Sequence, residues 1–132
     1  MYTPLYTPAD NPLFNMAHSC IAGAAAATPG KPALIVIRDA DAGPSEIWTY
    51  TDLKDAVLRT AGALRKLGLV PGDRVMIRLD NTSAYALLFF GAIAAGLVAL
   101  PASSQLTDRE ALFLPADSGA AAIASASPPP PW

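Results

Sequence analysis

Apolar residues recur along the chain in two alternating patterns. Short apolar runs at 33–37 (ALIVI), 74–79 (RVMIRL) and 97–100 (LVAL) are typical of buried strands. From Leu53 to Leu67, apolar residues instead recur at spacings of three and four, which predicts one amphipathic helix. Because strand and helix patterns alternate, we expect an α/β domain with a mostly parallel sheet and helices on both of its faces.

Capping residues indicate where the central helices begin and end. Thr49 and Asp52 have the spacing of a capping box at the start of the amphipathic helix, and Gly68 is typical of its end. We expect Ser83 to cap the next helix, which runs to about Gly96 and leads directly into the strand at 97–100.

In addition to the elements already named, the N-terminal part of the domain is predicted to contain one helix and one short strand. A helix is predicted over 14–27, where alanines have high helix propensity and either Asn11 or Asn15 is a suitable cap. A short strand at 47–49 is placed to pair with the strand at 33–37, across a turn-rich segment.

The C-terminal part begins with a second capping-box pair, Thr107 and Glu110. We expect Pro115 to cut this helix short, since a proline in a helix interior costs about 3 kcal/mol. A last strand is predicted over 120–124.

Prolines mark the two ends of the domain. Three prolines spaced by four predict that residues 1–13 form an extended N-terminal arm. The α/β unit then spans 14–124. Residues 125–132 (SASPPPPW) form a proline-rich tail, in which four consecutive prolines favour polyproline II and exclude a helix or a sheet strand.

Composition narrows the range of functions. The 132 residues suffice for one domain, and 52% hydrophobic with only 15% charged residues argues against disorder. The net charge is −2 and no basic run occurs, so a nucleic-acid partner is not expected. Cys20 is the only cysteine, which excludes an internal disulfide and fits a cytoplasmic protein. The uncharged stretch 84–102 is interrupted by glycines and a proline, so we interpret it as a buried helix and strand rather than a membrane span.

Few residues are candidates for chemistry. His18 and Cys20 lie about 200° apart if the helix predicted at 14–27 forms, which argues against a catalytic pair. We expect Cys20 in the core and interpret His18 as a surface or hydrogen-bonded histidine rather than a ligand. The polar segments 80–83 and 103–105 follow strands, where anions and other ligands bind in parallel sheets, although ordinary turn and cap chemistry explains them better. The sequence contains no GxG, no GxxxxGK[ST], no GxSxG and no HExxH motif.

An ordered series of short segments carries a family resemblance. WTY, LRKLGL, PGDRV, DNTSAY, FFGAIAAGLVALP, LTDRE and ADSGA follow one another between Trp48 and Ile123. In this order they resemble the N-terminal part of the adenylate-forming (AMP-binding) superfamily, most closely its acyl-CoA synthetases. The resemblance covers most of 14–124 and implies that this segment is a partial AMP-binding-type N-terminal domain, an incomplete subdomain of that fold.

The resemblance implies chemistry that lies mostly downstream of this segment. The full-length family uses ATP and Mg²⁺ to convert a carboxylic acid into an acyl-adenylate, and then transfers the acyl group to a thiol such as CoA. Its phosphate loop, adenine- and ribose-binding motifs and catalytic lysine have no match here. Lys31, Lys54 and Lys66 lie outside any family lysine motif. We therefore assign no catalytic, cofactor-binding or metal-binding residue to this chain.

These observations lead to two functional expectations. The first is an N-terminal fragment of an acyl-CoA synthetase-like ligase that is inactive alone. The second is a non-catalytic interaction module that docks on a separately encoded remainder or associates with itself. Because SASPPPPW departs from the family pattern, we also hypothesise a truncated or frameshifted gene end, which the coding DNA beyond codon 124 would test.

Overall fold

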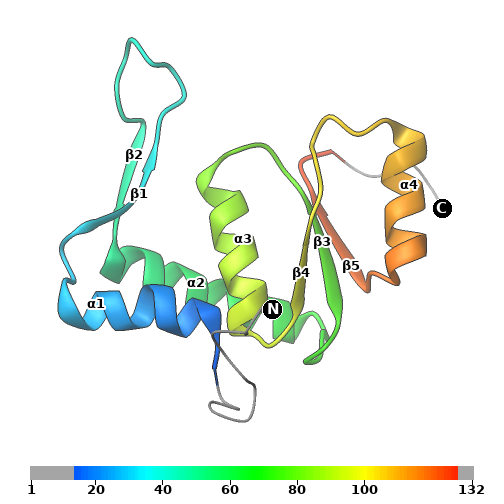
Figure 1. Ribbon diagram of the computed structural model, residues 1–132, viewed down its shortest axis with the longest axis horizontal. Coiled ribbons are helices and arrows are strands. Elements are labelled where there is room, and N and C mark those ends of the chain that lie inside the picture. The colour runs from blue at the N-terminus through cyan, green and yellow to red at the C-terminus, as the bar shows by residue number, and fades with distance from the viewer. Residues whose placement is uncertain (1–13, 128–132) are drawn as a thin grey trace, which may run out of the picture.

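The computed structural model describes residues 14–127 and contains two separate small sheets (Figure 1). The first is an antiparallel hairpin of β1 (Pro32–Val36) and β2 (Glu46–Thr49). The second is a parallel sheet with the order β4-β3-β5, made of β4 (Val98–Pro101), β3 (Arg74–Arg78) and β5 (Ala122–Ser125). The predicted arm at 1–13 and the prolines at 128–131 lie outside the described residues.

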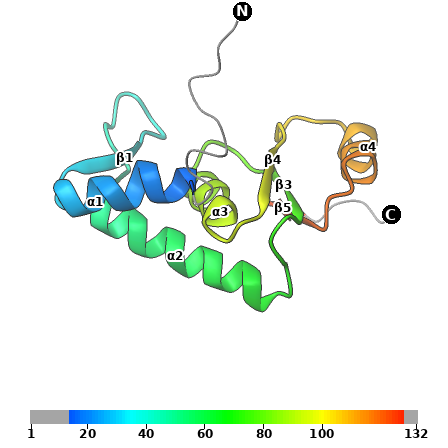
Figure 2. The same ribbon diagram turned by 60° about the horizontal axis from the view of Figure 1, so that its bottom comes forward.

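Helices pack on both sides of the parallel sheet (Figure 2). The helices are η1 (His18–Ala22), α1 (Gly23–Ala27), α2 (Tyr50–Lys66), α3 (Ser83–Ala94) and α4 (Asp108–Ser118). α3 and, behind it, α2 lie on one side, and α4 lies on the other. The helices cover both faces of the central strand β3, in which Val75 and Met76 are 1% exposed and Ile77 is fully buried. The predicted α/β fold with a parallel sheet is confirmed.

The strand predicted at 33–37 is not part of the parallel sheet, and it is not buried. It pairs with β2, as the sequence predicted, and Ile35 lies opposite Ile47. These two side chains are 51% and 59% exposed, whereas Val36, on the other face of the hairpin, is 6% exposed. The expectation of a buried strand was wrong because the hairpin projects away from the parallel sheet and has the protein on one face only (Figure 1).

The amphipathic helix α2 begins and faces the core as predicted. The capping box is formed: the Asp52 backbone N–H donates to Thr49 Oγ1, and the Thr49 N–H donates to the Asp52 carboxylate, each over 3.2 Å. Its buried face is Leu53, Ala56, Val57, Ala61 and Leu64. This face packs against α3, where a Cβ on Gly91 would lie 2.6 Å from the Thr60 Cγ2 atom. The two helices therefore approach closely because position 91 has no side chain.

The cap predicted for α3 is one residue off. Thr82 is the N-cap residue, its side chain makes no capping bond, and Ser83 is the first helical residue. Because Ser83 already lies in the first turn of α3, its side chain is past the N-cap position from which a cap accepts a bond from the helix N–H groups. Its hydroxyl instead lies near the Glu46 carboxylate of β2 and lowers the pKa of that group.

Pro115 does not cut α4 short, contrary to expectation. The helix continues to Ser118 with Pro115 inside it, and it ends at Gly119, whose φ of 65° is left-handed. Ala111 and Pro115 are the buried residues of this helix, and they lie four apart on one side of it. The Pro115 carbonyl also accepts from the N–H groups of Gly119 and Ala120. The proline loses its own N–H bond but contributes buried surface and holds the helix end.

The N-terminal helix is irregular. Its first part is a π-helix, in which the Gly23 N–H donates to the carbonyl of His18, five residues earlier. The His18 N–H donates to the Asn15 side chain over 3.2 Å, which is the bond expected of a cap at Asn15, whereas the alternative, Asn11, lies outside the described residues. Cys20 is exposed, and the prediction that it belongs to the core is wrong, because the buried row is Ala17, Ile21 and Ala25.

Between residues 14 and 127, no helix combines the length and the apolar character needed to cross a bilayer. The uncharged stretch at 84–102 forms α3 followed by β4, as the sequence indicated.

Candidate functional site

The strand order places a crevice at one point of the parallel sheet. From β3 the chain passes through α3 to β4 on one side of the sheet, and from β4 it returns through α4, past β3, to β5. The segments leaving β3 and β4 therefore separate to opposite faces. In open α/β sheets, ligands bind at such a switch point, outside the carboxyl ends of the strands.

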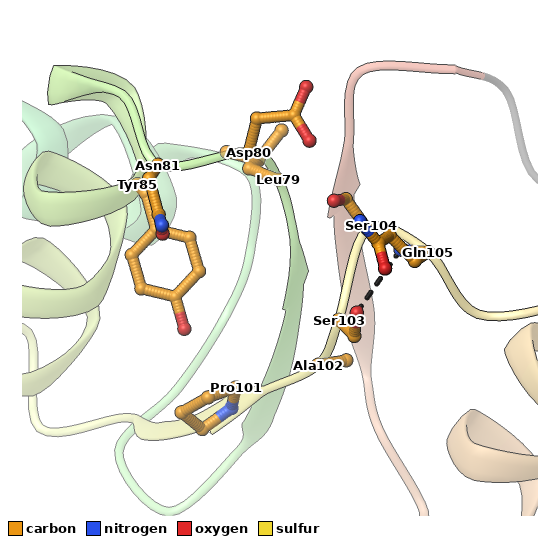
Figure 3. A pocket seen from close by; sticks show the side chains of 9 residues that line it. All are labelled: Leu79, Asp80, Asn81, Tyr85, Pro101, Ala102, Ser103, Ser104 and Gln105. Carbon is orange, nitrogen blue, oxygen red and sulfur yellow. Dashed lines mark hydrogen bonds between the residues drawn. The ribbon is translucent and has the colours of Figure 1, made fainter. Parts of the chain in front are cut away.

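A cavity of about 580 Å³ lies at this switch point (Figure 3). One wall comes from the segment after β3 and the start of α3, and includes Asp80, Asn81 and Tyr85. The other wall is the segment after β4, residues 101–105. The structure therefore brings Asp80 and Asn81, from the polar segment 80–83, together with the polar segment 103–105, which the sequence singled out separately. We call this cavity the carboxyl-edge crevice.

Several polar groups of the crevice form hydrogen bonds within the turns that follow β3 and β4. The Gln105 backbone N–H donates to Ser103 Oγ over 3.2 Å, and the Leu106 N–H donates to the Ser103 carbonyl. The Thr82 N–H donates to the Asp80 carbonyl over 2.7 Å. In Figure 3 the Asp80 carboxylate points away from Tyr85 and Pro101. This arrangement agrees with the turn and cap interpretation, and it presents hydroxyl and amide groups that can orient a ligand by hydrogen bonds.

A second hollow adjoins the crevice around Arg78, the last residue of β3. Arg78 Nη2 donates to the Leu106 carbonyl over 2.7 Å, while its Nε is buried and has no hydrogen-bond partner among the described residues. The hollow of about 300 Å³ is also lined by Asp80 and Asp108. Arg78 was not singled out from the sequence, although a charge inside the apolar run RVMIRL was a usable signal.

A network at the loop end of the hairpin strands centres on the half-buried Glu46. Its carboxylate accepts from Trp48 Nε1 and from Arg38 Nη2, each over 2.9 Å. The Trp48 bond, the nearby Ser83 hydroxyl and the Arg38 guanidinium lower the pKa of Glu46 from its ordinary value of 4.5. The two bonds hold the loop end of the hairpin together, and none of the three bonded residues lines the crevice.

The remaining candidates do not converge on a site. His18 and Cys20 are both exposed on the N-terminal helix, and Lys31, Lys54 and Lys66 lie on other elements than those that form the crevice. Within residues 14–127, no group of three or more His, Cys, Asp or Glu side chains is placed to hold a metal ion. The described residues of the crevice therefore provide a binding surface without a nucleophile and base in contact.

Comparison with known families defines the class of protein. The model of the AMP-binding enzyme family matches residues 21–129, so this chain belongs to the AMP-binding enzyme family. This finding confirms the resemblance drawn from the ordered sequence segments.

Curated relatives are acyl-CoA ligases. The long-chain-fatty-acid–CoA ligase FadD13 of Mycobacterium tuberculosis is 34% identical over 83 residues, which are 63% of this chain and 16% of that ligase. The 4-hydroxybenzoate–CoA/benzoate–CoA ligase of Rhodopseudomonas palustris is 32% identical over 84 residues, 64% of this chain and 16% of that protein. The chain thus spans 16% of the length of these relatives.

Solved structures agree with this assignment. A benzoate CoA ligase from Burkholderia xenovorans superimposes with a TM-score of 0.73 at 32% identity, over 86% of this chain and 22% of that one. The N-terminal subdomain of Klebsiella oxytoca NpsA gives a TM-score of 0.76 at 20% identity, over 90% of this chain and 30% of that one. The fold is that of part of the N-terminal subdomain of adenylate-forming enzymes.

Proposed function

We propose that this chain is the N-terminal part of an ATP-dependent acid–thiol ligase and is catalytically inactive by itself. The observation that carries the proposal is the share of the relatives that it spans, 16% of acyl-CoA ligases whose sequence it otherwise follows. In the complete cytoplasmic enzyme, ATP, Mg²⁺ and CoA would convert a carboxylic acid to its thioester through an acyl-adenylate.

The geometry of the crevice supports a structural and binding role for this part. Phosphoryl and adenylyl transfer depend on groups that position the nucleotide and stabilise its developing charge. The crevice offers Ser, Asn, Gln and Tyr side chains and an aspartate that points away from its centre. These groups can form one wall of a ligand site, whereas charge stabilisation requires groups from the rest of the enzyme.

The test is acid-dependent pyrophosphate release by the purified 132-residue chain with ATP, Mg²⁺ and a panel of aromatic and fatty acids. The benzoate CoA ligase of Burkholderia xenovorans, assayed in parallel with benzoate, is the positive control. We expect no release above the enzyme-free rate from this chain. Release that depends on the acid and on the chain concentration would refute the proposed inactivity.

A second candidate is an interaction module, and the exposed apolar surface of the hairpin favours it. Ile35, Ile37 and Ile47 are each more than half exposed, and within residues 14–127 β4 and β5 each pair on one side only. Such a module would dock on a separately encoded remainder of the enzyme or on a second copy of itself. Co-purification with a chain encoded downstream supports the first form, a concentration-dependent molar mass in light scattering supports the second, and a monomer without either contradicts both.

A further inference from the structure

A second cavity lies at the other end of α3 from the carboxyl-edge crevice. It measures about 410 Å³ and opens between the N-terminal helix, α2 and the end of α3. Its floor is apolar: Ala17, Ile21 and Val57 each have 3% exposure, and Ala94 adds the wall from α3. We call it the N-helix groove. It shares no lining residue with the crevice, so the inference drawn from it is independent of the proposed function.

The π-helix shapes this groove. In an α-helix, residues four apart share a face, whereas the wider π turn also brings the fifth residue to that face. Ala17, Ile21 and Ala22 therefore all line the groove. The Asn15 side chain fixes the helix start by donating to the Ile93 carbonyl at the end of α3 over 2.8 Å. π segments occur frequently at functional sites, because an inserted residue costs helix stability.

Lys54 is the one cationic side chain in the described lining of the groove. His18 also lines the groove, and none of the described lining residues is an aspartate or glutamate, although Asp55 lies beside Lys54. Lys54 Nζ lies 3.4 Å from Asp55 Oδ1, and both side chains are at least 36% exposed. An ion pair exposed to this degree contributes little, so the ammonium group is available to an anion held in the groove.

We propose that the N-helix groove binds a small amphipathic anion, with its apolar body on the Ala17–Ile21–Val57 floor and its charged head on Lys54 Nζ. Ligand cavities combine such an apolar lining with a few polar groups that fix orientation, and the volume falls within their usual range. A medium-chain carboxylate has the matching chemistry: one charged end for the ammonium group and an unbranched chain for the floor.

The probe is octanoate, titrated into the 132-residue chain and followed by the methyl NMR signals of Ala17, Ile21 and Val57. We expect saturable shifts of these signals. Octanol, which has the same chain without the charge, binds about tenfold more weakly, because one hydrogen bond to a charged group is lost. Lys54→Gln weakens octanoate binding by about the same factor and leaves octanol binding unchanged.

Two further variants make the result decisive. Arg59→Gln removes a positive charge from the same helix at a position outside the groove, and it must leave octanoate binding unchanged. Ala22→Leu, at a half-buried groove position, fills the cavity and abolishes binding while circular dichroism reports an intact fold. The proposal is overturned if octanoate causes no saturable shift, or if Lys54→Gln and Arg59→Gln weaken binding equally.

Discussion

Strands β1 and β3 have similar apolar runs, ALIV and VMI, yet they differ in their number of strand partners and in burial. β3 has a hydrogen-bonded strand on each side and helices over both faces, and Ile77 is fully buried. β1 has one partner, and alternate residues face outward, with Ile35 51% exposed. The comparison shows that an apolar run identifies a strand, whereas burial depends on what the rest of the chain brings against it.

The first prediction measures this difference in stability. Ile77→Ala should lower the free energy of unfolding by about 2–5 kcal/mol, because it leaves a cavity in a closely packed core. Ile35→Ala, the matched change on the exposed face of the hairpin, should cost less than about 1 kcal/mol. Urea unfolding followed by circular dichroism gives both values. If the two losses are equal, the outer face of the hairpin is covered in solution and the contrast with β3 fails.

The second prediction tests the close contact of α2 and α3 beside the sheet. Gly91→Ala should destabilise the protein by about 1–3 kcal/mol, because its Cβ would lie 2.6 Å from Thr60 Cγ2 and the helices must separate. Gly62→Ala, on the open side of α2, should stabilise by up to about 1 kcal/mol, because alanine favours a helix and, apart from the neighbouring helix backbone, no described atom would lie within 4 Å of the added Cβ. Thermal unfolding should show shifts of opposite sign. A gain in stability from Gly91→Ala would mean that the helices are not in this contact.

The same contrast explains what was predictable from the sequence. The α2 stripe and the two capping boxes depend on residues within one element, so Thr49, Asp52, Thr107 and Glu110 were placed correctly. The wrong expectations concerned the burial of the strand at 33–37, the Ser83 cap, Pro115 and Cys20. The burial of that strand depends on what packs against the hairpin, and the buried side of α4 accommodates Pro115.

The crevice shows the same limit. The two polar segments were recognised because each follows a strand, which is a local signal. Their convergence depends on the strand order β4-β3-β5, which places the two segments side by side at a switch point. Arg78 was missed because its isolated charge acquires meaning only when its side chain is seen to reach the Leu106 carbonyl.

The third prediction compares the two capping boxes. Thr107→Ala and Thr49→Ala each remove a side-chain cap, and each should cost about 0.5–2 kcal/mol of helix stability. α4 has only Ala111 and Pro115 buried, whereas α2 buries five residues. Amide exchange should therefore accelerate throughout α4 in Thr107→Ala and only in the first turn of α2 in Thr49→Ala. Equal, local acceleration in both helices would show that α4 is held as firmly as α2.

The smallest expected effect is the pH dependence contributed by the same boxes. Hydrogen bonds from the Thr49 hydroxyl and backbone lower the pKa of Asp52 from its ordinary value of 3.8, and those from Thr107 lower the pKa of Glu110 from 4.5. Since the folded pKa values lie below the unfolded ones, the stability that these carboxylates contribute is present above pH 4.5 and is lost as the pH falls through the folded values.

The double variant Asp52→Asn, Glu110→Gln should be less stable at pH 7 and should lose less stability between pH 5 and pH 2, in urea titrations at constant ionic strength. Because Glu46 also has a lowered pKa, part of the acid dependence should persist in this variant and disappear on adding Glu46→Gln. An unchanged slope in the double variant would mean that the capping carboxylates titrate alike in the folded and unfolded chains, and that the caps act through their neutral hydrogen bonds alone.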